Sequence, residues 1–161
     1  MRQEGVGVDG VDGVGVDLDA SMGYLLKETS SALRAAMEEV LRPLGMNLTR
    51  YACLELLAQR PGLSSSELAR GAFVTRQSMN VLLQALEREG FVTRPAEAAV
   101  GKVLPTTISP RGRRSLQEAS VAVRSVETRM MAGLTETERS DAFRILRSMV
   151  RSLRGDGDAG A

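Results

Sequence analysis

The sequence of 161 residues has no histidine, no tryptophan and a single cysteine, and these absences restrict the functions open to it. Without histidine there is neither a Ser–His–Asp nor a Cys–His catalytic arrangement, and histidine-containing zinc sites are excluded as well. One cysteine, Cys53, allows neither an intrachain disulfide nor a multi-cysteine metal site. The phosphate-binding motifs G-x-x-x-x-G-K-[ST] and strand-linked G-x-G-x-x-G are missing too. We therefore expect no enzymatic activity, no cofactor and no metal.

Aromatic residues are equally scarce, at 3% of the chain, whereas 43% of the residues are apolar. This composition predicts an aliphatic, methionine-filled core, which favours helices over an aromatic-rich β-sandwich. No apolar run approaches the roughly 18 residues that a membrane span requires. The N-terminus also lacks the basic-then-apolar order of a signal peptide. We expect a cytoplasmic protein that makes no membrane contact and holds Cys53 reduced.

The net charge of +1 hides an uneven distribution of charged residues. Residues 60–114 contain nine basic and four acidic side chains, a net charge of +5. The first twenty residues carry one arginine against five acidic residues, a net charge of −4. A basic middle section in a nearly neutral chain indicates a local site for a polyanion, although charge alone fits an ordinary solvated face equally well.

The two ends of the chain differ in composition from its middle. Residues 1–18 form a Gly/Val/Asp-rich run without helical or alternating periodicity, and we expect a disordered arm there. The glycine-rich tail, residues 155–161, is expected to be disordered as well. Between them, residues 19–46 have apolar side chains at spacings of three and four, which predicts a long amphipathic helix ended by Pro43 and Gly45.

Three shorter helices should follow, each with a recognisable start. The first follows Asn47, turns Leu54, Leu57 and Ala58 inward, and stops at residues 60–62. The second opens at Ser64-Ser65-Ser66-Glu67, a capping box in which the hydroxyl and the carboxylate satisfy each other's free backbone donors. The third begins at Thr75 and ends before Gly90, where a helix terminus favours a left-handed residue.

A hairpin and two further helices complete the chain. Residues 91–93 and 103–108 read as the two strands of a hairpin. Ser109-Pro110 supplies a cap and a first-turn proline for the next helix, whose inward positions are Leu116, Ala119, Val123, Val126 and Met130. Thr135 and Glu138 form a second capping box before a last helix with Phe143, Leu146, Met149, Val150 and Leu153. The predicted class is mainly α, with one small β-hairpin.

The helix of residues 75–89 has two sharply different faces. Its apolar face, at helical spacing, consists of Met79, Leu82, Leu83 and Leu86. The opposite face and its shoulder consist of Arg76, Gln77, Asn80, Val81, Gln84 and Arg88. Guanidinium and amide groups pair with guanine and adenine edges in a DNA major groove, and valine can meet a thymine methyl group. Taken alone, this pattern is also typical of an ordinary amphipathic surface helix. The order of the elements indicates a winged helix-turn-helix instead: a capped helix, a tight turn, a polar-faced helix and a basic hairpin.

Three stretches, YACLELLAQRPGLSSSELARG, VTRQSMNVLLQALEREGFVTRP and LPTTISPRGR, resemble the MarR family of bacterial transcription factors. The resemblance runs from about residue 22 to residue 153. It implies a homodimer of winged helix-turn-helix domains that binds pseudo-palindromic double-stranded DNA, and we expect a repressor. It further implies dimerisation through residues 19–46 and 110–154, and DNA binding through residues 47–109.

The resemblance and the helix pattern together predict the DNA-binding residues. They are Ser64, Ser65, Thr75, Arg76, Gln77, Ser78, Asn80, Gln84, Arg94 and Lys102. At the wing tip the family usually has Asp-x-Arg, but this chain has Val100-Gly101-Lys102. A valine cannot orient a basic neighbour, and lysine offers a point charge rather than a planar fork. We therefore expect this wing to attract phosphate without reading sequence.

Regulation by a small molecule is the other implication of the resemblance, since many relatives bind phenolic or amphipathic effectors beside the dimer helices. Met22, Tyr24, Leu26 and Met37 could line such a pocket, although methionine at helical spacing is more often core. The alternatives are a redox regulator acting through Cys53 and a protein-interaction module that no longer reads DNA. A buried thiol has a raised pKa and is inert, and reactive cysteines of relatives correspond to Gly23 here, which disfavours the redox alternative.

Overall fold

The computed structural model describes residue 15, residues 17–94 and residues 105–155. In these ranges the chain forms six α-helices, a short 3₁₀ helix and a two-stranded sheet, which confirms the predicted fold class. The elements are α1 (Met22–Leu41), η1 (Arg42–Leu44), α2 (Leu48–Gln59), α3 (Ser65–Gly71), α4 (Arg76–Arg88), β1 (Val92–Thr93), β2 (Thr107–Ile108), α5 (Pro110–Met130) and α6 (Glu136–Arg154).

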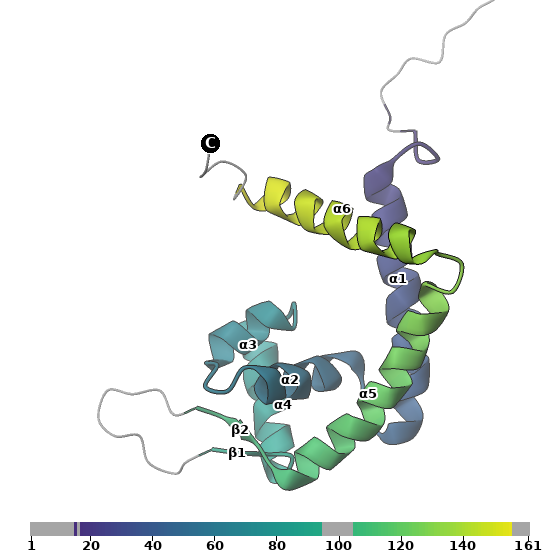
Figure 1. The fold of residues 1–161 in the computed structure, drawn as a ribbon. Helices are drawn as coiled ribbons and strands as arrows, with labels where there is room; N and C mark the ends of the chain where they lie inside the picture. The colour runs from purple at the N-terminus through teal and green to yellow at the C-terminus, as the bar shows by residue number, and fades with distance from the viewer. Residues whose placement is uncertain (1–14, 16, 95–104, 156–161) are drawn as a thin grey trace, which may run out of the picture.

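The elements form a lobe and a group of long terminal helices (Figure 1). Helices α2, α3 and α4 and the hairpin form one lobe, in which α3 packs against α4 and α2 packs against α3. Helix α5 starts at the base of the hairpin, crosses α2 and then runs along α1. Helix α6 follows at the far end of α5, away from the lobe.

Local sequence signals start most of these helices as predicted. The side chains of five residues, the four predicted caps and Asn47, each accept a hydrogen bond from the backbone N–H three residues later: Asn47, Ser64, Thr75, Ser109 and Thr135. Each such bond satisfies one of the free donors of a first helical turn, and loss of such a cap costs about 1 kcal/mol. Helix α1 begins three residues later than expected, at a cap formed by Ser21.

One aliphatic core holds the lobe to α5. The apolar face of α4 contributes Met79, Leu83 and Leu86, all fully buried, whereas Leu82 is half-buried. Helix α5 contributes Leu116, Ala119 and Val123 at the predicted inward positions. Val126 is buried as well, but the prediction for Met130 is wrong, because α5 has run past the core by then and leaves that side chain 49% exposed.

The hairpin is shorter than predicted. Val92 pairs with Ile108 and Thr93 pairs with Thr107 in an antiparallel register, and the two threonine hydroxyls lie 2.7 Å apart. Val92 and Ile108 face the core, whereas the threonines face solvent. The predicted strand residues 103 and 104, like the predicted wing tip, lie outside the described residues.

The terminal helices leave apolar side chains uncovered. Leu41 is the one buried residue of α1, and α6 has none within the described chain. Exposed apolar side chains on these two helices include Met22, Leu25, Phe143, Leu146, Val150 and Leu153. Among the described residues, no helix combines the length and the apolar character needed to cross a membrane.

Candidate nucleic-acid interface

Helix α4 presents a polar face to solvent along its whole length. Gln77, Asn80 and Gln84 are exposed, and so are Arg76 and Arg88 at the two ends. Because Met79, Leu83 and Leu86 anchor the opposite face in the core, the polar face is held in one orientation. These side chains can donate to and accept from base edges without disturbing the packing of the helix.

The first turn of α4 is ordered by hydrogen bonds between its own side chains. Thr75 Oγ1 accepts from the backbone N–H of Ser78 at 3.1 Å and donates to Ser78 Oγ at 2.9 Å. Arg76 Nη1 donates to Ser66 Oγ on α3 over 3.4 Å. The bond to Ser66 was not anticipated from the sequence, since it joins residues ten positions apart. It links the starts of α3 and α4 beside the positive end of the α4 dipole.

The start of α3 is fixed by its capping box. Ser64 Oγ donates to the Glu67 carboxylate at 2.7 Å and accepts from the Glu67 backbone N–H at 3.3 Å. The Ser64 hydroxyl and backbone N–H hold the pKa of Glu67 below its usual value, so this carboxylate stays ionised. Ser64 therefore already serves the fold, while its neighbour Ser65 is half-buried at the first helical position.

The turn between α3 and α4 contains an unusual residue that the sequence did not single out. Phe73 has φ 56°, and it is the one non-glycine residue of the described chain with a positive φ. Its ring is 87% exposed. The left-handed conformation costs a residue with a side chain roughly 1–2 kcal/mol. Sequence patterns give no signal for this position, because glycine or asparagine is the residue expected there.

Of the two basic wing residues predicted to bind DNA, Arg94 lies in the described part of the chain and Lys102 does not. Arg94, directly after β1, is half-buried, and its Nε and Nη2 atoms are buried without an acceptor among the residues described. Part of the guanidinium group is therefore buried, and its charge is close enough to Cys53 to act on the pKa of that thiol. Lys102 lies outside the described residues.

The junction of α4, the hairpin and α5 is tightly packed. Gly90 ends α4 with φ 76°, as its predicted position requires. Ser109 Oγ donates to the Gly90 carbonyl at 2.6 Å, and the Ser109 N–H donates to the Phe91 carbonyl at 3.0 Å. A Cβ atom on Gly112 would lie 2.2 Å from that same Phe91 oxygen. Helix α5 therefore rests directly on the backbone that leaves α4.

Phe91 is also held from the side by two arginines. The guanidinium carbon of Arg50 lies 5.2 Å from the ring centroid, and that of Arg111 lies 5.0 Å from it. Arg50 also forms an ion pair with Glu89 at the end of α4. Contacts between a cation and a ring contribute about 0.5–1 kcal/mol at exposed sites. Through this cluster, α2 and α5 both contact the start of the wing.

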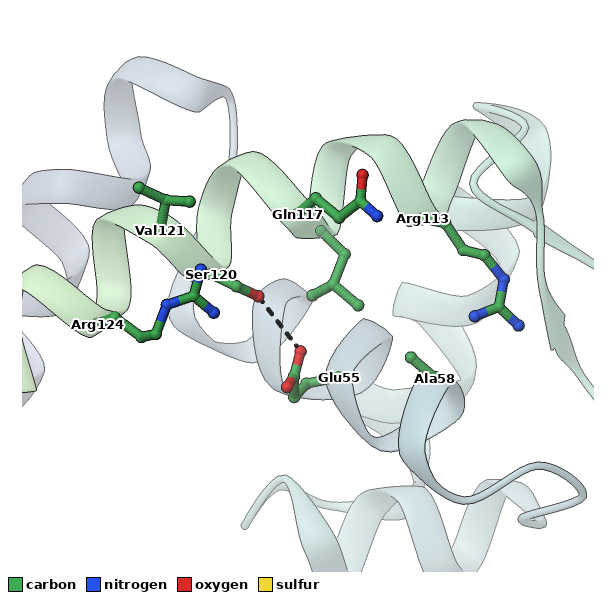
Figure 2. A pocket seen from close by; sticks show the side chains of 8 residues that line it. Glu55, Ala58, Arg113, Gln117, Ser120, Val121 and Arg124 are labelled. Carbon is green, nitrogen blue, oxygen red and sulfur yellow. Dashed lines mark hydrogen bonds between the residues drawn. The ribbon is translucent and has the colours of Figure 1, made fainter.

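A hollow of about 370 Å³ lies between α2 and α5 (Figure 2). Its lining consists of Glu55, Ala58, Arg113, Leu116, Gln117, Ser120, Val121 and Arg124. Arg113 and Arg124 lie at its two ends, and Ser120 Oγ donates to Glu55 over 3.5 Å between them. A second hollow, of about 400 Å³, separates α1 from α5 and includes Arg129. Of the predicted pocket residues, Met22 and Tyr24 border a third hollow of about 340 Å³, whereas Met37 packs against the core.

Cys53 is fully buried in α2, as predicted. Burial raises the pKa of its thiol to about 12, although the nearby Arg94 charge acts in the opposite direction. At neutral pH the thiol is therefore protonated, and the thiolate that reacts with oxidants is suppressed. This environment gives no support to a redox switch at Cys53.

A capped supporting helix, a tight turn, a polar-faced helix and a two-stranded hairpin on one lobe define a winged helix-turn-helix protein. The sequence profile of the MarR family matches residues 44–102. The chain is also 42% identical over 136 residues to the HTH-type transcriptional repressor Rv2887 of Mycobacterium tuberculosis, covering 84% of this chain and 98% of that protein. The chain therefore belongs to the MarR family, which confirms the resemblance found in the sequence.

Solved structures of the M. tuberculosis MarR family protein Rv2887 agree with this assignment. Its complex with salicylic acid matches with a TM-score of 0.68 and 43% identity, over 81% of this chain and 97% of that one. Its complex with DNA matches with a TM-score of 0.67 and 39% identity, over 81% and 98% of the two chains. Both similarities extend over the lobe and the long helices together.

Proposed function

We propose that this protein is a homodimeric transcriptional repressor that binds a pseudo-palindromic operator and is released from it by a small aromatic acid. The observation that carries the proposal is the polar face of α4, fixed by a buried apolar face and anchored to α3. The similar M. tuberculosis protein is named a repressor and has been solved with DNA and with salicylic acid. A regulator of this kind works in the cytoplasm and has no catalytic step.

In the proposed complex, α4 enters the major groove, and the predicted residues contact either base edges or phosphates. Arg76 is suited to guanine, while Asn80, Gln77 and Gln84 are suited to adenine. Val81, exposed between them, is suited to a thymine methyl group. Ser64, Ser65, Thr75 and Ser78 lie at the starts of α3 and α4, where backbone N–H groups and the helix dipoles favour phosphate. Arg94 and Lys102 supply positive charge from the wing.

Two copies of α4 must be joined for a palindrome to be recognised. The apolar faces of α1 and α6, uncovered in one chain, support a second copy as the partner. Residues 19–46 and 110–154 accordingly form the dimerisation part, and residues 47–109 form the DNA-binding part. In such a dimer the two α4 helices lie about 34 Å apart, one turn of DNA.

The proposal is tested by operator binding with three single variants. Arg76→Ala and Asn80→Ala should each lower the preference for operator over scrambled DNA by about tenfold, because one bidentate base contact is worth about 1–3 kcal/mol. Lys102→Ala should weaken binding to both duplexes equally and reduce the salt dependence by about one counterion. Fluorescence anisotropy with the upstream region of the protein's own gene, at several salt concentrations, measures all three.

Glu136→Gln, at the start of α6 and far from α4, serves as the control and should bind both duplexes as the parent does. If all three variants bind both duplexes as this control does, α4 and the wing are not the surface that binds DNA. If the parent protein binds no duplex and instead retains a protein partner, the protein-interaction alternative is correct.

The hollow between α2 and α5 is the proposed effector site. It has an arginine at each end and apolar lining from Ala58, Leu116 and Val121, which suits a carboxylate attached to a ring. Helix α2 belongs to the DNA-binding lobe, and α5 leads out of that lobe. A ligand between them therefore changes the angle between the lobe and α5. This coupling would separate the two reading helices from their half-sites.

Salicylate should therefore bind the protein and release it from operator DNA. Arg124→Gln, in the hollow between α2 and α5, is expected to weaken salicylate binding by about tenfold, because it removes a charge-assisted hydrogen bond. Arg129→Gln, which alters the hollow between α1 and α5, is the matched control and should bind salicylate normally. Calorimetric titration of both variants decides between the two hollows. If Arg129→Gln weakens salicylate binding and Arg124→Gln does not, the effector site is the hollow between α1 and α5.

A further inference from the structure

We propose that Phe73 is a DNA-contacting residue, whose ring packs on a deoxyribose at the rim of the groove that α4 enters. The inference deepens the proposed function, on which it rests, by adding an apolar contact from the turn to the polar contacts of α4. Three features of the turn lead to it: the backbone conformation of Phe73, the exposure of its ring, and its place beside the start of α4.

The conformation of Phe73 is one that phenylalanine avoids. With φ 56° it occupies the left-handed region, where Cβ crowds the following carbonyl oxygen and where glycine is free of that cost. The turn is nonetheless well defined, since the Phe73 N–H donates to Arg70 O at 3.3 Å and the Val74 N–H donates to Ala69 O at 3.0 Å. A side chain at this position therefore makes the folded chain less stable than glycine would.

The ring gains nothing from folding that would offset this cost. It is 87% exposed, whereas its neighbour Val74 is half-buried against the core. A large apolar side chain left in water at a strained position indicates a contact that forms only in a complex. The folded chain alone gives no reason for phenylalanine here.

The place of Phe73 in the fold identifies that partner. It lies two residues before Thr75, the N-cap of α4, in the turn that joins α4 to α3. The bond from Arg76 to Ser66 joins the start of α3 to the start of α4, and the turn directly precedes the start of α4. A helix that enters the groove by its N-terminal turn brings these segments to the DNA backbone. Phenylalanine has no charge for the phosphate, so its ring suits the C–H face of the sugar.

The test is Phe73→Gly, which should move stability and affinity in opposite directions. Removing the strained side chain is expected to raise the unfolding midpoint by about 2–4 °C. The same change should weaken operator binding by about fivefold and leave the salt dependence unchanged, because no phosphate charge is lost. A variant that is more stable and yet binds worse cannot owe its defect to misfolding. Phe73→Leu, which keeps an apolar side chain, should retain part of the affinity.

Leu18→Ala provides the matched control, since it shortens another exposed apolar side chain, which is 53% exposed and lies before α1, outside the proposed DNA-binding surface. Its operator affinity should equal that of the parent. The proposal is overturned if Phe73→Gly binds operator as tightly as the parent, or if it alters dimerisation instead of DNA affinity. If Arg76→Ala binds operator as tightly as the parent in the same assay, α4 is not the surface that binds DNA. That result would overturn the proposed function as a whole, not the role of Phe73 alone.

Discussion

Replacing Gly112 with alanine is expected to cost about 3 kcal/mol of stability and most of the operator binding, although the change adds a single methyl group. A Cβ at this position would lie 2.2 Å from the Phe91 carbonyl oxygen and 2.9 Å from Cγ1 of Ile108. Neither neighbour can move freely, because Phe91 O accepts from the Ser109 N–H and Ile108 is paired with Val92. Overpacking of a well-ordered core commonly costs about 1–3 kcal/mol, and a backbone contact lies at the upper end.

Operator binding should fall with stability because the contact lies where α5 meets the end of α4. Moving α5 away from Phe91 would change the angle between the reading lobe and the rest of the chain. Gly133→Ala is the matched control, since a Cβ there has no atom within 4 Å. Thermal unfolding followed by circular dichroism should separate the two variants by about 6–12 °C, at about 2–4 °C for each kcal/mol. Equal midpoints would mean that α5 does not rest on Phe91.

Charging the apolar face of α6 should convert the protein to a monomer. Leu146 and Val150, one helical turn apart, are 46% and 45% exposed in the single chain. If a second copy covers them, Leu146→Asp with Val150→Asp places two charges in a desolvated interface, at several kcal/mol. The mass measured by light scattering should halve. Operator affinity should fall at least a hundredfold, because the two half-sites are then bound independently.

Ser148→Asp with Ser152→Asp adds the same charge to α6 at neighbouring exposed positions outside the apolar face. This control should remain dimeric and should bind the operator within a few-fold of the parent. If the leucine–valine variant keeps its dimeric mass, the apolar face of α6 is not the dimer contact. A loss of dimer in both variants would indicate general charge repulsion instead.

Features determined by neighbouring residues could be predicted from the sequence. Ser64 and Glu67 close a capping box because their groups are three residues apart, and that distance is set by helix geometry alone. The same holds for Gly90, where a side chain is disfavoured after the last turn of α4. The buried face of α4 followed from a period of 3.6 residues, which needs no knowledge of the partner elements.

Features that depend on distant residues could not be predicted. The sequence does not indicate that Gly112 touches Phe91, or that Arg76 reaches back to Ser66, because each contact depends on how two elements are placed. The charge of Arg94 predicts a contact with DNA, whereas the structure buries part of its guanidinium group near Cys53. Met130 continues the inward periodicity of α5, yet the core ends before that residue is reached.

The packing around Phe91 has a consequence for how an effector signal is expressed. Because Arg50 of α2 and Arg111 of α5 contact the same ring, and Ser109 bonds the backbone on either side of it, α2, the end of α4, the base of the hairpin and the start of α5 turn together as one body. An effector that shifts the part of α5 beyond this junction then changes the distance between the two DNA-binding lobes of the dimer and leaves each lobe intact. The bases preferred within each half-site stay the same, while the preferred number of base pairs between half-sites changes.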